Sequence, residues 1–182
     1  LLRWHHPTRG LITPAKFIPL AEQTGLILPI GRWVLLQACH QVARWQRRYP
    51  GSAPRYVSVN LSVMQLHDPG LVEDTADALA QSGLDPSSLT LEITESMLLA
   101  KTAQTMQTLE QLKALKIKIA IDDFGTGYSS LSYLRHFPVD VLKIDRSFVQ
   151  ELAISPTSHS LVAAVIDLAH RLNIDTVAEG IE

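Results

Sequence analysis

The stretch Lys118-Ile119-Ala120-Ile121-Asp122-Asp123-Phe124-Gly125 decides the predicted fold of this 182-residue chain. Its apolar run has the length and composition of a buried β-strand, and we expect a strand over 118–122. The strand ends in two adjacent carboxylates, which repel each other, and a glycine-containing loop follows. A cation that offsets this repulsion is the first hypothesis, so the stretch predicts a metal site at a strand end.

Short apolar runs like this one alternate along the chain with longer amphipathic segments. The expected strands, each about as long as a buried parallel strand, are 1–4, 56–61, 89–94, 118–122, 141–145 and 176–179. Apolar residues at helical spacing predict helices in the gaps, around 13–25, 34–45, 71–83, 106–112 and 162–169. Regular alternation of strand and helix indicates βαβ units and a parallel sheet, either open and doubly wound or closed into a barrel.

The two faces of the expected strands distinguish a closed barrel from an open, doubly wound sheet. One face is small or polar in strand after strand, as with Ser58 and Asn60 or with Ala120 and Asp122, while the other face is aliphatic. An open sheet has helices on both faces and needs aliphatic residues on both, whereas a barrel gathers polar side chains in its lumen. We therefore predict an α/β fold of the (β/α)8-barrel type, with its site at the carboxyl ends of the strands.

Polar residues end consecutive strands on this face and define the candidate site. They are Asn60, Glu92, Asp122, Asp123, Lys143, Asp145 and Glu179. Carboxylate and amide oxygens suit Mg²⁺, Mn²⁺ or Ca²⁺ rather than zinc, for which histidine or cysteine is expected. Any one of these carboxylates alone is equally well explained as a helix cap or a lysine partner. The series as a whole favours a site for a hard cation.

Two basic residues share the acidic end of the expected strands. Lys143 lies in an apolar run, where an unpaired ammonium is costly to bury. It is either a structural ion pair with Asp145 or Asp122, or a group that orients water or stabilises charge on a phosphoryl oxygen. Arg3, at the end of the first expected strand, is suited to binding a phosphate.

The loop Gly125-Thr126-Gly127 does not predict a dinucleotide-binding fingerprint. It lacks the third glycine and follows two aspartates that would repel a pyrophosphate. We expect either a loop with unusual backbone angles or an ordinary tight connection. Glu95, three residues after Glu92, either tethers a neighbouring loop or begins the next helix.

Composition indicates one soluble domain over 1–182 and gives no sign of a nucleic-acid polymer as partner. The formal net charge is −2 and 46% of the residues are hydrophobic. Cys39 is the only cysteine, which favours a reducing compartment, and we expect the cytoplasm. No run reaches the roughly 20 apolar residues of a membrane span. The seven histidines are expected in loops or on helices, away from the acidic residues.

Six motifs, in order along the chain, give it a resemblance to EAL domains, the cyclic-di-GMP phosphodiesterase modules of bacterial signalling proteins. They are Leu1-Leu2-Arg3-Trp4, Val59-Asn60-Leu61-Ser62, Leu91-Glu92-Ile93-Thr94-Glu95, Asp122-Asp123-Phe124-Gly125-Thr126-Gly127-Tyr128-Ser129-Ser130-Leu131, Leu142-Lys143-Ile144-Asp145 and Glu179-Gly180-Ile181-Glu182. The resemblance covers essentially the whole chain. It implies a modified (β/α)8 barrel with an antiparallel first strand.

The resemblance also implies roles for particular residues. Asn60, Glu92 and Asp122 would hold a first Mg²⁺ or Mn²⁺ ion, and Asp122 would bridge to a second ion held by Asp123. Glu179 would bind at the second ion or act as a base, and Lys143 would hold the attacking water. The remaining implied roles are substrate contact for Arg3 and Asp145, and loop anchoring or regulation for Glu95, Gly125, Thr126, Gly127 and Glu182.

Two parts of the family pattern fall outside the chain. The glutamate of the Glu-Ala-Leu signature would precede Leu1, and a last strand with a glutamine-containing segment would follow Glu182. We therefore expect a fragment truncated at both ends, with an incomplete barrel and weak or no activity when isolated. A longer parent, in which all the residues named above are intact, is expected to hydrolyse cyclic-di-GMP to linear pGpG.

Two other functions stay open at this point. One is a non-catalytic receptor that binds cyclic-di-GMP, although such members usually lose metal ligands that this chain keeps. The other is a barrel enzyme that acts on a different phosphate ester with a divalent metal. The resemblance further implies a homodimer formed through the loop after Asp123, and fusion to sensory or GGDEF domains in a parent that could carry a membrane anchor.

Overall fold

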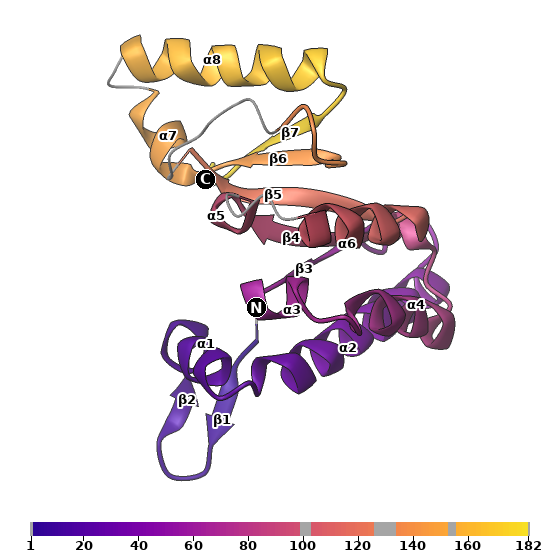
Figure 1. The fold of residues 1–182 in the computed structure, drawn as a ribbon. Helices are drawn as coiled ribbons and strands as arrows, with labels where there is room; N and C mark the ends of the chain where they lie inside the picture. Colours follow the sequence, from indigo (N-terminus) through magenta and orange to yellow (C-terminus); the bar gives the residue numbers. More distant parts are fainter. Residues whose placement is uncertain (1, 99–102, 126–133, 153–155, 182) are drawn as a thin grey trace.

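The computed structural model describes residues 2–98, 103–125, 134–152 and 156–181, with only the backbone of Pro156. Its centre is a five-stranded parallel sheet in which every strand pairs with its neighbour in sequence (Figure 1). The strands are β3 (Val57–Asn60), β4 (Leu89–Thr94), β5 (Lys118–Phe124), β6 (Val141–Ile144) and β7 (Asp175–Ala178). The α/β class and the parallel sheet predicted from the sequence are confirmed.

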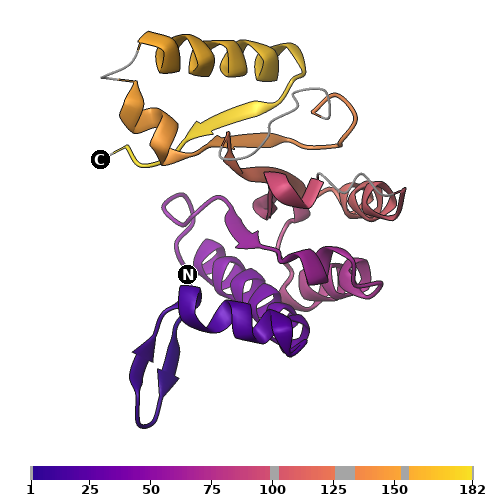
Figure 2. The same ribbon diagram turned by 60° about the vertical axis from the view of Figure 1, so that its left-hand side comes forward.

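Helices precede or connect the strands of this sheet. They are α1 (Pro14–Gln23), α2 (Ile27–Arg48), α3 (Val63–Leu66), α4 (Leu71–Ser82), the 3₁₀-helix η1 (Pro86–Ser88), α5 (Glu95–Leu98), α6 (Ala103–Ala114), α7 (Arg146–Glu151) and α8 (Pro156–Arg171). Figures 1 and 2 show the sheet curving, with α4, α6 and α8 outside the curve. Sequential strand order with helices outside is the arrangement of a barrel wall. Among the described residues the wall does not close, and β3 and β7 are its edges.

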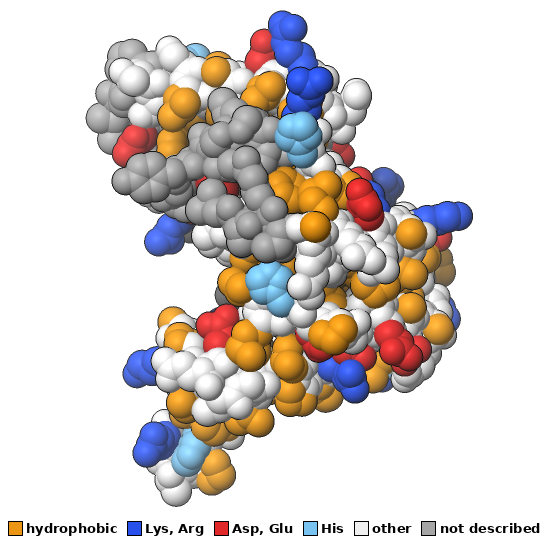
Figure 3. Space-filling view, in the orientation of Figure 1, with side chains coloured by type: hydrophobic (Ala, Val, Ile, Leu, Met, Phe, Trp, Pro, Cys, Tyr) orange, Lys and Arg blue, Asp and Glu red, His pale blue; other side chains and the backbone are white. Residues whose placement is uncertain are grey.

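The core lies between the sheet and these outer helices. Leu91, Ile119 and Leu142 come from three adjacent strands and are fully buried on the aliphatic face. Leu109 and Leu112 of α6, one helical turn apart, are equally buried against this layer. The polar strand-end residues lie on the opposite face of these strands. The space-filling view shows that the molecule is hollowed on its left side (Figure 3). The alternation of aliphatic and polar residues along each strand therefore places the core on one face of the sheet and the candidate site on the other.

The expected first strand over 1–4 is wrong. Trp4–His6 forms β1, which pairs antiparallel with β2 (Gly10–Ile12) in a hairpin separate from the main sheet. The turn is short, so closing it costs little entropy, and His6 Nδ1 accepts hydrogen bonds from the backbone N–H groups of Thr8 and Arg9 at 3.2 and 3.3 Å. His5 and His6 consequently lie on a strand, and not in a loop or helix as expected.

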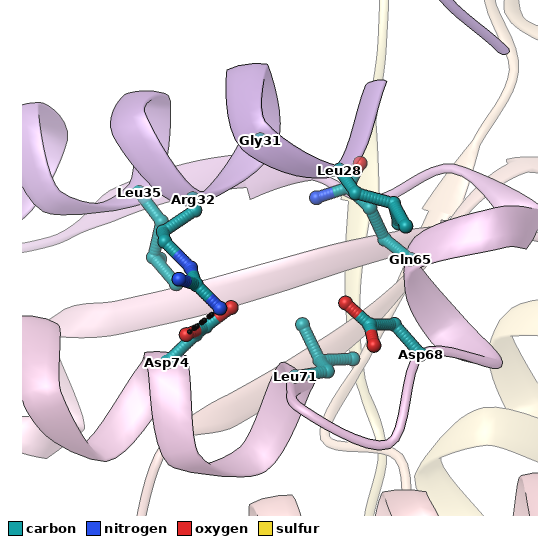
Figure 4. A pocket seen from close by; sticks show the side chains of 8 residues that line it. All are labelled: Leu28, Gly31, Arg32, Leu35, Gln65, Asp68, Leu71 and Asp74. Carbon is teal, nitrogen blue, oxygen red and sulfur yellow. Dashed lines mark ion pairs between the residues drawn. The ribbon is translucent and has the colours of Figure 1, made fainter. Parts of the chain in front are cut away.

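A close contact between α2 and α3 fixes the chain that leaves β3. Gln65 of α3 lies directly over Gly31 of α2, where a Cβ atom would overlap the Gln65 amide. The Gln65 side chain also accepts a hydrogen bond from the Ser62 N–H at 3.2 Å, completing a capping box. Nearby, Arg32 Nη2 lies 2.8 Å from Asp74 Oδ1 and ties α2 to α4 (Figure 4). These contacts fix the segment that directly follows Asn60.

None of the described helices is both long enough and apolar enough to cross a bilayer.

Candidate functional site

A β-bulge at the end of β5 shapes the site. Ile121 pairs with Leu142 and Phe124 pairs with Ile144, so Asp122 and Asp123 together lie opposite the single residue Lys143. Asp123 adopts the left-handed conformation, with φ of 53°. A bulge redirects a side chain that regular pairing would send to the opposite face. Both carboxylates of the pair are therefore available at the same strand end.

Lys143 is the centre of the site. Its Nζ atom lies 3.1 Å from Glu92 Oε1, 2.8 Å from Asp122 Oδ1 and 2.7 Å from Glu179 Oε1. Burial alone would lower the pKa of Lys143, but hydrogen bonds to Asp122 and Glu179 and the charge of Glu92 more than offset it and raise the pKa. The ammonium is therefore charged and joins strand ends from β4, β5 and the segment after β7.

Backbone hydrogen bonds hold the flanking strand ends in place. The Leu61 N–H donates to the Glu92 carbonyl at 2.8 Å, just after Asn60, and the register pairs Asn60 with Glu92. The Glu179 N–H donates to the Ile144 carbonyl at 3.1 Å. Asn60 is exposed at the sheet edge, whereas Glu92 is buried. Six residues expected at the carboxyl ends thus lie along one row across neighbouring strand ends. The row consists of Asn60, Glu92, Asp122, Asp123, Lys143 and Glu179.

Three carboxylates of this row satisfy the geometry of a metal site. Asp122, Asp123 and Glu179 each offer an oxygen atom, and these atoms lie within 4.8 Å of one another. Oxygens bound to one divalent ion at roughly 2.0–2.6 Å are at most about 5 Å apart. The donor set consists only of oxygens, which suits Mg²⁺ or Mn²⁺. The residues present therefore fit a hard divalent cation.

The surroundings of Asp123 disfavour its ionised form. Burial raises its pKa above the usual aspartate value, and the nearby charges of Asp122, Asp145 and Glu179 raise it further, while Lys143 acts in the opposite direction. Its own N–H donates to Asp122 Oδ1 at 3.1 Å. An ionised Asp123 is thus held where it is electrostatically unfavourable, which is typical of functional sites.

Replacing Asp123 with asparagine is expected to stabilise the metal-free protein while weakening metal binding. The gain is about 0.5 kcal/mol near neutral pH, because solvent screens this exposed group. The folded-state pKa of Asp123 is raised, so its ionisation costs stability above that pKa and the cost disappears as pH falls toward the unfolded value. Urea unfolding in EDTA at pH 7 and pH 4, with Mn²⁺ titration, measures both effects. Unchanged stability at pH 7 contradicts this expectation.

Glu95 fulfils both structural alternatives considered for it. It is the first residue of α5, it is buried, and its Oε2 accepts a hydrogen bond from the Gly125 N–H at 3.1 Å. The contact joins α5 to the loop that follows Asp123. A regulatory role for Glu95 and Gly125 stays a prediction, and Thr126, Gly127 and Glu182 lie outside the described residues.

Asp145 and Arg3 were also expected at the site, and the structure gives each of them a different local role. The Asp145 carboxylate accepts a hydrogen bond from the Ser147 N–H at 3.0 Å and caps α7. Hydrogen bonds from the Ser147 hydroxyl and N–H lower the pKa of Asp145. Arg3 lies just before β1, is exposed, and donates to the Leu2 carbonyl at 2.9 Å. Substrate contact by either residue stays a prediction.

Sequence reasoning did not find the short helix α7, which begins at Arg146 after its N-cap residue Asp145. The spacing Asp145-x-Ser147 is a helix-start signal that could have located α7.

The fold and site define a class of protein: an α/β domain of barrel type with an acidic group that could hold a metal ion at the carboxyl ends of its parallel strands. Residues 1–182 match the family model described as EAL domain. The chain belongs to the EAL domain family.

Relatives of known description agree with this assignment. The chain is 49% identical over 182 residues to the bifunctional diguanylate cyclase/cyclic di-GMP phosphodiesterase MucR of Pseudomonas aeruginosa, covering 100% of this chain and 26% of MucR. It is 42% identical to the cyclic di-GMP phosphodiesterase PA2567 of the same species, covering 100% of this chain and 30% of that protein. The chain thus spans only about a quarter of the length of such relatives.

A solved structure gives the same answer for the fold. The structure described as PaMucR phosphodiesterase in complex with c-di-GMP superimposes with a TM-score of 0.90 at 48% identity, covering 100% of this chain and 73% of that one. The predicted resemblance is confirmed.

Proposed function

We propose that residues 1–182 form part of a single domain that, within the full-length protein, hydrolyses cyclic di-GMP to linear pGpG with two divalent ions, Mg²⁺ or Mn²⁺. The observation that carries this proposal is the row of carboxylates around Lys143, with three of its oxygens close enough to share an ion. The phosphodiesterase names of two relatives and the c-di-GMP complex of a third protein support the choice of substrate.

The charge of the row supports two ions. Glu92, Asp122, Asp123 and Glu179 with Lys143 carry a net charge of −3 when all are ionised. One divalent ion leaves the group negative, whereas two make it positive, and a positive site suits an anionic phosphodiester. We assign Asn60, Glu92 and Asp122 to one ion, and Asp122, Asp123 and Glu179 to the other.

When bound, the ions would supply Lewis acidity toward the phosphodiester and its attacking water. The protein's own groups position the reactants. Lys143 contacts three carboxylates in this structure, and once these carboxylates turn to the ions its charged ammonium would have donors to hold the water that attacks phosphorus. Glu179 Oε1 lies 2.7 Å from Lys143 Nζ, close to that water, where a carboxylate can accept its proton.

The test uses the full-length protein that contains this chain. Cyclic di-GMP is incubated with it in Mn²⁺, in Mg²⁺ and in EDTA, and nucleotides are separated by liquid chromatography and identified by mass. Linear pGpG in both metals and none in EDTA is the expected result. Tight binding of cyclic di-GMP with no product in either metal would establish a receptor instead. Product from a different phosphodiester alone would assign another substrate.

Further features of the protein remain proposals. We propose a homodimer formed through the loop after Asp123, fusion to sensory or GGDEF domains in a longer parent, and a cytoplasmic location. The bifunctional name of MucR, of which this chain matches 26%, supports fusion to a second enzymatic domain.

A further inference from the structure

One short helix, α7, packs against the two loops that follow candidate metal ligands. Phe148 of α7 lies against Gly125, where an added Cβ atom would be 2.5 Å from Phe148 Cε2. Gly125 has φ of 103°, a conformation that side chains disfavour. The Phe148 ring therefore packs directly on the backbone of Gly125, at a position where any other side chain would clash with the ring.

The same helix has a second contact of this kind. An added Cβ atom on Gly180 would be 2.7 Å from Arg146 Cβ, and Gly180 has φ of 71°. Asp145 caps the start of α7 through the Ser147 N–H at 3.0 Å, which fixes the first turn of the helix. The first turn of α7 is thus packed between the loop after β5 and the loop after β7.

Both glycines are neighbours of candidate ligands in sequence. Gly125 follows Asp123 by two residues, and Gly180 follows Glu179 directly. The helix itself follows β6, which carries Lys143. Movement of α7 would therefore change the positions of three groups of the site together.

Asp123 has particular need of such a restraint. It is exposed, left-handed, and surrounded by the carboxylates of Asp122 and Glu179. Repulsion favours its movement away from the row. The Gly125 N–H donates a hydrogen bond to Glu95 Oε2 at 3.1 Å, and the Phe148 ring packs on Gly125. Two contacts therefore restrain Gly125, which follows Asp123 by two residues.

We propose that Phe148 is a positioning residue that acts through the backbone of Gly125 to hold Asp123 in its metal-binding orientation. The proposal rests on the proposed function, because it assumes that Asp123 binds a divalent ion. Groups that orient metal ligands commonly contribute 10-fold to 100-fold in metal affinity.

Mn²⁺ binding without substrate, measured by electron paramagnetic resonance titration of the full-length protein, tests the proposal. Phe148→Ala is expected to weaken the Asp123-dependent Mn²⁺ site about 10-fold, and Phe148→Leu to weaken it less. Val149→Ala is the matched control, since Val149 is a half-buried residue of the same helix packed on the core. It is expected to bind Mn²⁺ like the wild type. In hydrolysis assays, saturating Mn²⁺ should restore most of the rate of Phe148→Ala.

Three results would overturn the proposal. If both Phe148 variants bind Mn²⁺ like the wild type, Phe148 does not position Asp123. If Val149→Ala weakens binding as much as Phe148→Ala, the effect is general loosening of α7. If the wild type itself binds no Mn²⁺, the proposed function fails together with this inference. Should Phe148→Ala not fold, Phe148→Leu alone decides between weakened and unchanged binding.

Discussion

Replacing Asp122 with asparagine is expected to reduce cyclic di-GMP hydrolysis by at least about 1,000-fold. Asp122 and Glu179 both contact Lys143 and both belong to the group of three candidate metal-binding carboxylates, but only Asp122 is assigned to both ions. A metal ion supplies several kcal/mol of transition-state stabilisation, and each 1.36 kcal/mol changes the rate tenfold. Loss of a ligand that we assign to both ions should remove most of this contribution.

The measurement is a comparison of hydrolysis rates and Mn²⁺ affinity for the wild type and Asp122→Asn. Asparagine has the shape of aspartate, and circular dichroism checks that the variant is folded. Asp167→Asn serves as the control, because Asp167 is exposed on α8 and pairs with Arg171 of the same helix. A receptor could lose the metal and keep its affinity for cyclic di-GMP. A variant that hydrolyses within tenfold of the wild-type rate would exclude Asp122 as a ligand.

Replacing Lys143 with methionine is expected to abolish hydrolysis and to cost about 3 kcal/mol of stability in EDTA. Lys143 is 15% exposed and contacts three carboxylates, the most buried of which, Glu92, is 8% exposed. Without the ammonium these carboxylates repel one another in the folded protein. Mn²⁺ at about 100 times its dissociation constant should recover about 2.7 kcal/mol, while activity stays absent.

The pH dependence gives this prediction a second readout. In the variant, the three carboxylates repel one another only while they are ionised. The destabilisation is then greatest at neutral pH and shrinks as acid neutralises the carboxylates. Urea unfolding at pH 7 and pH 4, with exposed Lys16→Met as control, measures it. Equal stability of Lys143→Met and the wild type in EDTA would show that the three contacts are not what holds the row together.

The sequence predicted the sheet well where the signal was local and strong. The expected strand over 89–94 agrees with β4 to the residue, because its apolar run is bounded by clear turn and helix-start signals. The polar row was also predictable, since side chains alternate along every strand and Asn60, Glu92, Asp122 and Lys143 share one parity.

The features that were missed depend on pairing between segments. The strand expected to end at Asp122 continues to Phe124, and the bulge at Asp122 and Asp123 exists only relative to β6. A single strand carries no sign of how many of its residues will face one residue of its neighbour. The β1–β2 hairpin was missed because the run from Leu1 to Trp4 resembled a parallel strand, while its partner Gly10–Ile12 is too short to give a periodic signal.

The position of α7 could not be predicted for a similar reason. Gly125 and Gly180 were visible as glycines, but their contacts with Phe148 and Arg146 join segments that are far apart in sequence. Helices of this length give little periodicity, and the Asp145-x-Ser147 cap was the only local sign.

Anomalous diffraction from crystals soaked in Mn²⁺ tests the metal-binding row most directly. We predict two manganese peaks, one in contact with Asp122, Asp123 and Glu179 and the other in contact with Asn60, Glu92 and Asp122. Absence of anomalous density at these carboxylates, in crystals of protein that hydrolyses cyclic di-GMP in the same buffer, would contradict the assignment of this row as the metal site.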